Sequence, residues 1–232
     1  MCRIETLEPR DAYALWAASY PPHAHNPVMR AEERAMQALM PADLQGQVVL
    51  DAGCGSGRYM LHALRRDATH VTGIDLSIEM LERASEELGA YRHGGQVELV
   101  QANLLKLPLP NASADLAICG LTIGHLDRLR PALAELRRVT RPGGTILCSD
   151  VHPIGHALGW ARDFKSDGRH FAVKHTPHLY SEWHAACAAL RLDIVRVLEP
   201  MLDPADIPVD AHFDPLALEV PVALVFLLRR ST

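Results

Sequence analysis

The stretch Val48-Val49-Leu50-Asp51-Ala52-Gly53-Cys54-Gly55-Ser56-Gly57 decides the fold of this chain. A short apolar run ends in an acidic residue and leads into three alternating glycines, and a helical segment follows from about Arg58. Glycine permits positive φ values and close approach of a ligand to the backbone, and the start of a helix offers unpaired amide hydrogens. The stretch therefore predicts a strand, a ligand-binding turn and a helix.

An acidic residue at the end of the next predicted strand extends this motif. That strand covers about residues 70–75 and ends in Asp75, whose carboxylate can accept hydrogen bonds from both hydroxyls of a ribose. Dinucleotide dehydrogenases need the glycine spacing G-x-G-x-x-G, which is absent here, and the carboxylate of Asp51 would repel a pyrophosphate. We therefore favour a ligand with a cationic amino group and a sulfonium over a dinucleotide, and over a turn that binds nothing.

Strands and helices alternate from residue 47 to about residue 150. The expected strands cover residues 48–51, 70–75, 97–101, 115–119 and 145–150, and the expected helices cover residues 58–66, 78–88 (behind Ser77 as N-cap) and 130–140. This alternation predicts a parallel sheet with helices on both faces. Two later strands, at residues 193–199 and 220–229, have no evident helix between them, which predicts an antiparallel pair.

The N-terminal segment has a different pattern. Tyr13, Trp16 and Tyr20 recur at spacings of three and four, which places them on one helical face, and Pro21-Pro22 then breaks the helix. A second helical stretch runs from about Val28 to Met40. The aromatic face either forms a lid over the ligand or packs on the sheet edge.

Composition excludes several classes of protein. A formal net charge of -5 disfavours nucleic acid as a partner, because such proteins usually carry a basic surface. The five scattered cysteines, without a C-x-x-C, fit a reducing compartment. The N-terminus lacks a signal core, and no uncharged apolar run approaches the ~18 residues of a membrane span. We expect a cytoplasmic protein.

With these motifs in place, the sequence resembles the class I S-adenosylmethionine-dependent methyltransferases, over about residues 45–230. Four blocks in the family's order carry the resemblance, and they are residues 48–57, 71–76, 101–116 and 136–150. The nearest subgroup is the ubiquinone/menaquinone-biosynthesis-like enzymes that act on small molecules. The resemblance implies an α/β, Rossmann-like, seven-stranded, mostly parallel sheet with an antiparallel last strand, helices on both faces and an N-terminal helical cap. It also implies in-line methyl transfer from S-adenosyl-L-methionine to a small-molecule acceptor.

The resemblance further implies which residues hold the amino-acid part of the cofactor. Gly53, Gly55 and Gly57 would line its methionine portion. Asp51 would orient the amino group, directly or through water.

At the nucleoside end, the resemblance implies that Asp75 holds the ribose and that Leu76 lies against the adenine. Asn103 and Leu104 would meet the adenine edge. The family more often has Asp at the position of Asn103, and an Asn can accept the adenine amino hydrogens only through its carbonyl oxygen. A capping role for Asn103 therefore stays open. Met80 either packs on the adenine or belongs to the core.

Two histidines follow strands at the edge of the sheet where α/β proteins bind ligands. His125 comes after the fourth strand and His152 after the fifth. Both are candidate catalytic residues, with a structural histidine as the alternative in each case. His152 is also a candidate substrate-binding residue, together with Tyr13 and Tyr20.

Residues 152–180 are rich in His, Pro and Gly and have no clear periodicity, which is typical of an insertion. We expect this insertion to form a mobile, acceptor-binding cap. His175, His178 and His184 could in principle ligate a metal, but no Cys or paired carboxylate joins them at ligand spacing. We expect no metal.

The expected organisation is an N-terminal helical cap segment at residues 1–45 and a methyltransferase domain at residues 46–232. Family members that methylate DNA or protein amides carry an Asn/Asp-Pro-Pro-aromatic segment where this chain has residues 119–122, Cys-Gly-Leu-Thr. We expect a small-molecule acceptor, no nucleic acid and no membrane as partners, and leave a homodimer open. Two rival functions also stay open, a cofactor-binding enzyme that catalyses a cyclisation, decarboxylation or hydrolysis, and a noncatalytic binding subunit.

Overall fold

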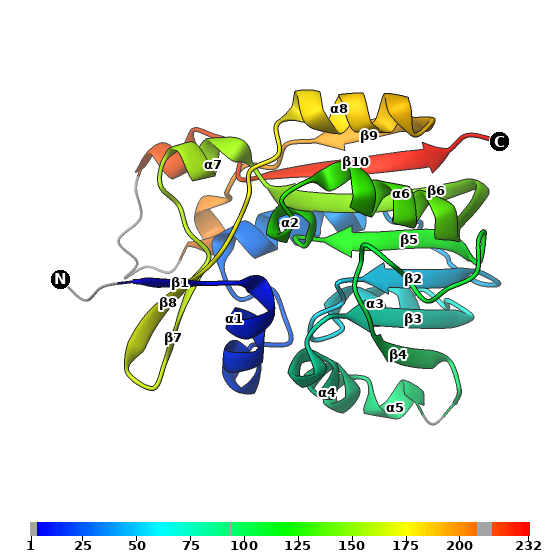
Figure 1. Ribbon diagram of the computed structural model, residues 1–232, viewed down its shortest axis with the longest axis horizontal. Coiled ribbons are helices and arrows are strands. Elements are labelled where there is room, and N and C mark those ends of the chain that lie inside the picture. Colours follow the sequence, from blue (N-terminus) through cyan, green and yellow to red (C-terminus); the bar gives the residue numbers. More distant parts are fainter. Residues whose placement is uncertain (1–3, 93, 208–214) are drawn as a thin grey trace.

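A seven-stranded sheet runs through the middle of the molecule (Figure 1), for which the computed structural model describes residues 4–92, 94–207 and 215–232. In sheet order the strands are β4 (Val97–Gln101), β3 (His70–Asp75), β2 (Val48–Ala52), β5 (Ala114–Gly120), β6 (Thr140–Val151), β10 (Ala223–Arg230) and β9 (Leu192–Leu198). β10 pairs antiparallel with β6 and β9, and all other neighbouring strands are parallel. The predicted sheet is confirmed. The connector before β10 includes residues 208–214, which lie outside the described residues.

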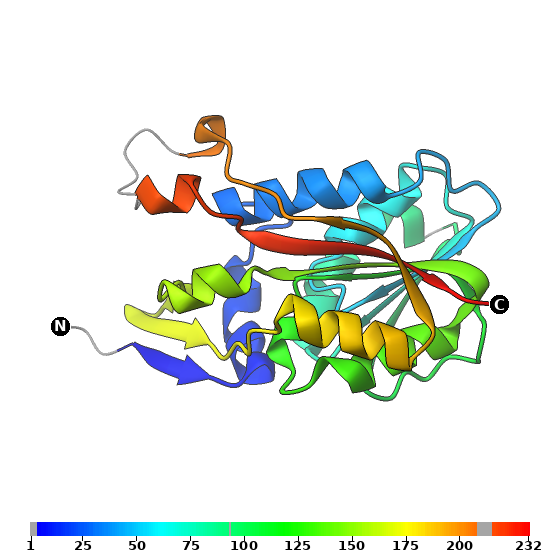
Figure 2. The same ribbon diagram turned by 90° about the horizontal axis from the view of Figure 1, so that it is seen from above.

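Helices cover both faces of this sheet, as predicted (Figure 2). One face carries α2 (Pro27–Leu39), α3 (Arg58–Leu64) and α4 (Ile78–Glu87), and the other carries α6 (Leu129–Val139) and α8 (Tyr180–Ala189). Helix α4 begins where the Ser77 hydroxyl accepts a hydrogen bond from the Met80 amide over 3.2 Å, so the predicted N-cap is confirmed. A short helix, α5 (Gly89–Arg92), follows α4.

Strand β6 begins earlier than predicted. Helix α6 ends at Val139 as expected, but β6 already starts at Thr140. Thr140 pairs with Ala114 and Thr145 with Leu116, so the Pro142-Gly143-Gly144 stretch bulges out of the ladder. The glycines therefore mark a bulge within a strand rather than a separate loop.

A second, three-stranded sheet stands beside the large one and was not predicted. Its order is β1 (Glu5–Leu7), β8 (Arg169–Val173) and β7 (Asp163–Ser166), with β1 parallel to β8 and β7 antiparallel to it. Residues 152–180 thus form a short helix, α7 (Pro153–Ala157), and a hairpin rather than an aperiodic segment. The N-terminal segment is mainly helical, as predicted, but it also contributes β1, which was not predicted because its partner lies far along the chain.

Helix α1 (Pro9–Trp16) and the 3-10 turn η1 (Ala17–Ser19) place the aromatic residues between the two sheets. Trp16 stacks on Phe164 of β7, with ring centroids 4.7 Å apart. Tyr20 is buried and lies edge-on to Trp16. The N-terminal segment and the hairpin therefore pack together. None of the described helices has the length and apolar character needed to cross a membrane.

Candidate active site

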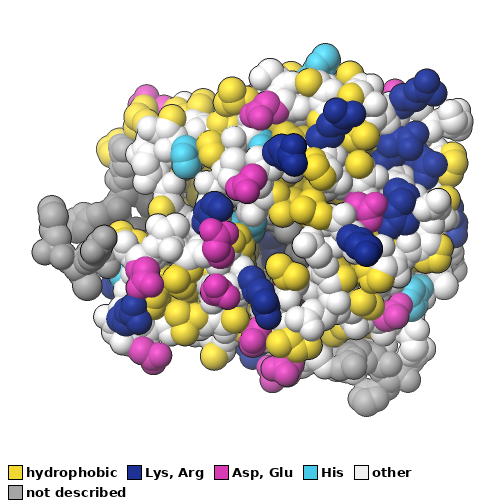
Figure 3. Space-filling view, in the orientation of Figure 1, with side chains coloured by type: hydrophobic (Ala, Val, Ile, Leu, Met, Phe, Trp, Pro, Cys, Tyr) yellow, Lys and Arg dark blue, Asp and Glu magenta, His cyan; other side chains and the backbone are white. Residues whose placement is uncertain are grey.

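A cavity of about 320 Å³ lies where α1 approaches the C-terminal ends of β2, β3 and β5. In the space-filling view, the surface is hollowed near the middle of this face (Figure 3). Most of the predicted site residues line the cavity, namely Tyr13, Tyr20, Gly53, Gly55, Asp75, Leu76, Asn103, Leu104 and His125. Asp51 lies buried at the end of β2, and Gly57 forms the N-cap of α3.

Two contacts shape the glycine turn at Gly53, and the first of them requires glycine. Gly53 has φ +77, and a Cβ added there would lie 2.9 Å from the Cβ of Thr122 and closer still to its Oγ1 and Cγ2. The Gly53 amide donates to the Ile74 carbonyl over 2.7 Å, which holds the turn against β3. The turn can therefore take this path only without a side chain at Gly53.

The carboxylate of Asp75 joins the turn to the start of α4. Its Oδ2 accepts a hydrogen bond from the Gly55 amide and its Oδ1 one from the Ser77 amide, each over 2.9 Å. Burial raises the pKa of Asp75, although these backbone donors act against the rise. An ionised carboxylate has about four acceptor positions, so lone pairs remain for a ligand's hydroxyls.

The two oxygens of the buried Asp51 carboxylate make no hydrogen bond of normal geometry with the described residues. Burial raises the pKa of Asp51 to about 7, although the Arg58 charge and the nearby Met60 amide act against the rise. A buried polar group left unpaired is costly, so such a group indicates a missing donor. The amino group of S-adenosylmethionine, directly or through water, would supply that donor. The residues present therefore fit this cofactor.

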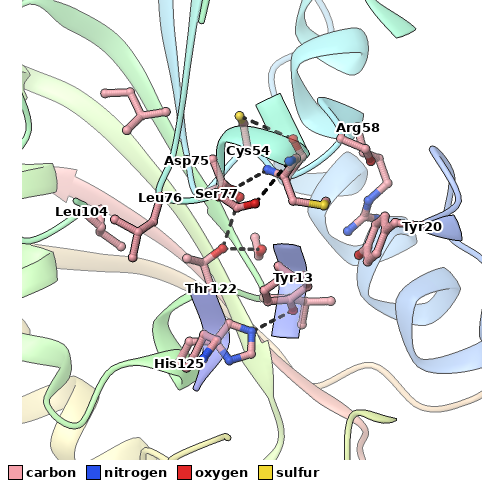
Figure 4. A pocket seen from close by; sticks show the side chains of 18 of the residues that line it. Tyr13, Tyr20, Cys54, Arg58, Asp75, Leu76, Ser77, Leu104, Thr122 and His125 are labelled. Atoms are coloured by element: carbon pink, nitrogen blue, oxygen red, sulfur yellow. Dashed lines mark hydrogen bonds between the residues drawn. The ribbon is translucent and has the colours of Figure 1, made fainter. Parts of the chain in front are cut away.

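The opposite end of the cavity is apolar. Leu76 and Leu104 lie side by side in Figure 4, away from Tyr20 and Arg58. The Asn103 side chain accepts a hydrogen bond from the Leu105 amide over 2.8 Å, so it caps its own turn while it lines the cavity. The geometry thus leaves one free lone pair on the Asn103 carbonyl for a ligand.

Tyr13 and His125 form a hydrogen-bonded pair at the cavity wall (Figure 4). The Tyr13 hydroxyl lies 2.9 Å from His125 Nε2, and His125 Nδ1 lies 3.1 Å from the Lys174 carbonyl. A carbonyl only accepts, so Nδ1 carries a proton and Nε2 of the neutral ring accepts the Tyr13 proton. Burial lowers the pKa of His125 to about 3, which keeps the ring neutral near pH 7.

The structure does not bring His152 to the cavity. Its Nδ1 accepts a hydrogen bond from the Ile154 amide over 3.2 Å at the start of α7, and its Nε2 lies 3.3 Å from Glu199. The chain turns away from the sheet edge directly after β6. Its ring therefore supports α7 in this structure.

The other histidines of the insertion do not come together. His175 Nε2 lies 3.1 Å from Asp150 Oδ1, and His178 Nε2 lies 3.0 Å from the Leu126 carbonyl. His184 lies beside Tyr180 in α8. In the described part of the chain, no three His, Cys, Asp or Glu side chains are grouped as metal ligands.

Sequence reasoning missed a buried network behind the cavity wall. Glu32 of α2 is fully buried and accepts hydrogen bonds from Ser149 Oγ over 2.5 Å, from the Tyr59 hydroxyl over 2.6 Å and from Arg58 over 3.2 Å. Arg58 also pairs with Glu33. Tyr59 and Arg58 line the cavity, so Glu32 holds two side chains of the wall. A Glu within an amphipathic helix gives no sequence signal for this role.

Two further lining residues were missed. Thr122 lies within hydrogen-bonding distance of the Gly53 and Gly120 carbonyls and closes the turn from β5. Arg162 reaches the cavity from the segment before β7. Its surroundings in the sequence show no periodicity, so no signal pointed to it.

Comparison with known proteins shows which family this chain resembles. Residues 50–148 match the family model described as "Methyltransferase domain". Over 180 residues the chain is 34% identical to the malonyl-[acyl-carrier protein] O-methyltransferase of Pectobacterium atrosepticum, a match that covers 76% of this chain and 66% of that relative. It is also 34% identical to the O-methyltransferase rstn1 of Aspergillus nomiae over 110 residues, 47% of this chain and 49% of that relative. The chain thus spans less than two thirds of the length of these curated relatives.

Solved structures with a similar fold include a methyltransferase of the same cofactor class. An S-adenosylmethionine dependent methyltransferase from Mesorhizobium loti has a TM-score of 0.66 and 27% identity, with 86% of this chain and 98% of that chain covered. The [4+2]-cyclase SpnF has a TM-score of 0.69 and 16% identity, with 100% and 98% covered. At that identity the second likeness concerns the fold alone.

Proposed function

Because the chain belongs to the class I S-adenosylmethionine-dependent methyltransferases, we propose that it transfers a methyl group from S-adenosylmethionine to an oxygen atom of a small-molecule acceptor. The observation that carries this proposal is the unpaired, buried carboxylate of Asp51, next to a turn that Asp75 fixes. Transfer to oxygen is supported by the names of the curated relatives, which are O-methyltransferases.

Different residues of the cavity would bind different parts of the cofactor. Asp51 and the glycine turn would hold the amino-acid part of the cofactor, Asp75 the ribose, and Leu76 with Leu104 the adenine. When bound, S-adenosylmethionine supplies a methyl group on a sulfonium, which is an already activated leaving group. The protein therefore mainly aligns the acceptor and excludes water, and alignment alone can contribute about 7–11 kcal/mol.

The acceptor would lie near Tyr13 and His125, which lie below Thr122 in Figure 4. Tyr13 and Tyr20 belong to the N-terminal segment that packs on the hairpin, so this segment would shield the reacting atoms from bulk water. The Tyr13 hydroxyl, whose proton is committed to His125, would form part of the wall beside the bound acceptor.

A thermal-shift experiment tests the cofactor. S-adenosylmethionine or S-adenosylhomocysteine should raise the Tm, because a ligand at 100 times its Kd stabilises a protein by about 2.7 kcal/mol. NAD at the same concentration should have no effect. Stabilisation by NAD without stabilisation by the sulfonium compound would contradict the proposal. Formation of S-adenosylhomocysteine with hydroxyl and carboxyl acceptors then separates methyl transfer from the rival functions.

Replacing Asp75 tests where the ribose binds. Asp75→Ala should weaken S-adenosylhomocysteine binding by about 1.5–3 kcal/mol, the range for hydrogen bonds to charged groups. Isothermal titration calorimetry measures the change, and Asp193→Ala at an exposed position of β9 is the control. Unchanged affinity in a folded Asp75→Ala variant would place the ribose elsewhere.

A further inference from the structure

Arg162 brings a positive charge without a negative partner to the cavity. Its Nη2 donates a hydrogen bond to the Tyr20 hydroxyl over 2.7 Å, and no Asp or Glu side chain of the described residues pairs with it. The other arginines that line the cavity are either paired with acidic residues or exposed to solvent. Arg58 pairs with Glu32 and Glu33, and Arg10 is exposed to solvent. Among these lining residues, Arg162 therefore combines shelter from solvent with an unneutralised charge.

Aromatic rings hold this guanidinium in place. Its Cζ lies 5.4 Å from the ring centroid of Tyr13 and 5.8 Å from that of Trp16, within the range of cation–π interactions. Trp16 itself stacks on Phe164 two residues beyond Arg162. A guanidinium carries five N–H donors, and Tyr20 accepts one of them. The remaining donors form a fixed fork of the kind that matches a carboxylate.

The same part of the cavity is poorly equipped to remove a proton from an acceptor. The Tyr13 hydroxyl already donates to His125, and His125 could accept its proton only as a buried cation. Burial lowers the pKa of His125 to about 3, so its ring is a weak base. The remaining lining carboxylate on this side, Glu8, is exposed and pairs with Lys174. An alcohol or phenol would therefore find no effective base here, whereas a carboxylate arrives already ionised.

We infer that the acceptor is a carboxylate, that Arg162 binds it, and that the product is its methyl ester. This inference rests on the proposed function. One carboxylate oxygen forms the new bond to the methyl carbon, the bond between sulfur and that carbon breaks with its electron pair going to sulfur, and no proton is transferred. The esterified group carries no charge, so methylation removes the ion pair of that group with Arg162 and favours product release.

The experiment uses the full chain saturated with S-adenosylhomocysteine for binding and with S-adenosylmethionine for turnover. The probes are acetate, malonate, glutarate and benzoate, each with its primary amide as the uncharged counterpart, and phenol as a hydroxyl acceptor. Calorimetry measures binding, and mass spectrometry identifies methyl esters and ethers. The variants are Arg162→Met, Arg162→Lys and, as the matched control, Lys165→Met, which removes an exposed cation from β7.

We expect carboxylates to bind and to be esterified in preference to amides and phenol. Arg162→Met should lower carboxylate affinity and kcat/KM by about 100-fold, within the range for losing one partner of a buried charge pair. Arg162→Lys should fall between wild type and Arg162→Met, because a lysine keeps the charge but not the fork. Lys165→Met should behave as wild type. Unchanged S-adenosylhomocysteine affinity in every variant shows that the fold is intact.

Two kinds of failure are distinguishable. If the wild-type chain does not bind S-adenosylhomocysteine, the proposed function is wrong and the inference falls with it. If it binds S-adenosylhomocysteine but binds and methylates carboxylates no better than amides or phenol, the inference alone is overturned. Unchanged carboxylate binding and turnover in Arg162→Met would likewise overturn the inference and leave the proposed function standing.

Discussion

Glu32→Leu is expected to lower the free energy of unfolding by about 3–5 kcal/mol, the cost of removing one partner from a buried charged network. The substitution leaves the buried Ser149 hydroxyl and the Tyr59 hydroxyl without their acceptor. It also removes one of the two acidic partners of Arg58. Urea unfolding followed by circular dichroism measures the loss.

Glu33→Leu is the matched control, because Glu33 binds the same guanidinium from the next position of α2. The Glu33 side chain is 21% exposed to solvent, whereas the Glu32 side chain is fully buried. A pair that stays in contact with water contributes about 0–1 kcal/mol, so Glu33→Leu should cost much less than Glu32→Leu. Equal losses would mean that the burial of Glu32 is not what makes its network important.

Gly53→Ala is expected to reduce cofactor affinity by about 100-fold, since an L-residue forced into a positive φ stores about 1–3 kcal/mol of strain and this site adds a steric clash. The new methyl group would meet the Thr122 side chain, which itself is held by the Gly120 carbonyl. The turn must then move away from β5, and its amides with it. Calorimetry with S-adenosylhomocysteine measures the effect.

Gly143 offers a control with the same φ. It also has φ +77, but nothing lies within 4 Å of an added Cβ. Gly143→Ala should therefore leave cofactor affinity unchanged. The double variant Gly53→Ala, Thr122→Gly removes the clash but not the strain, so it should recover part of the affinity. If the double variant recovers no cofactor affinity, backbone strain at position 53 accounts for the whole loss.

The large sheet could be predicted from the sequence because its signals are local. The strand at residues 48–51, the glycine turn and Asp75 follow one another within thirty residues, and each element shows its own periodicity. The small sheet could not be predicted. β1 has three residues, too few for a pattern, and it pairs with residues more than 160 positions away.

The site was predictable to the extent that its residues sit at the ends of strands. The glycines and Asp75 follow from the motif, and His125 follows from its place after β5. Position after a strand fixes the edge of the sheet but not the direction of the chain, and the chain after β6 turns so that His152 supports α7. Arg162 depends on the packing of α1 against the hairpin, which no local pattern encodes.

The pairing of β1 with β8 also sets an order of assembly. Closing a loop costs more conformational entropy as the loop lengthens, and contacts between distant residues form late in folding. During synthesis, β1 leaves the ribosome before residues 169–173, so it must wait for them before it has a partner. The glycine turn needs β3, which ends at Asp75, and Thr122 at the end of β5, and both precede residues 169–173 in the chain. On this order, we expect the part of the cavity around the glycine turn to take shape before the part around Arg162, which depends on the pairing of β1 with β8.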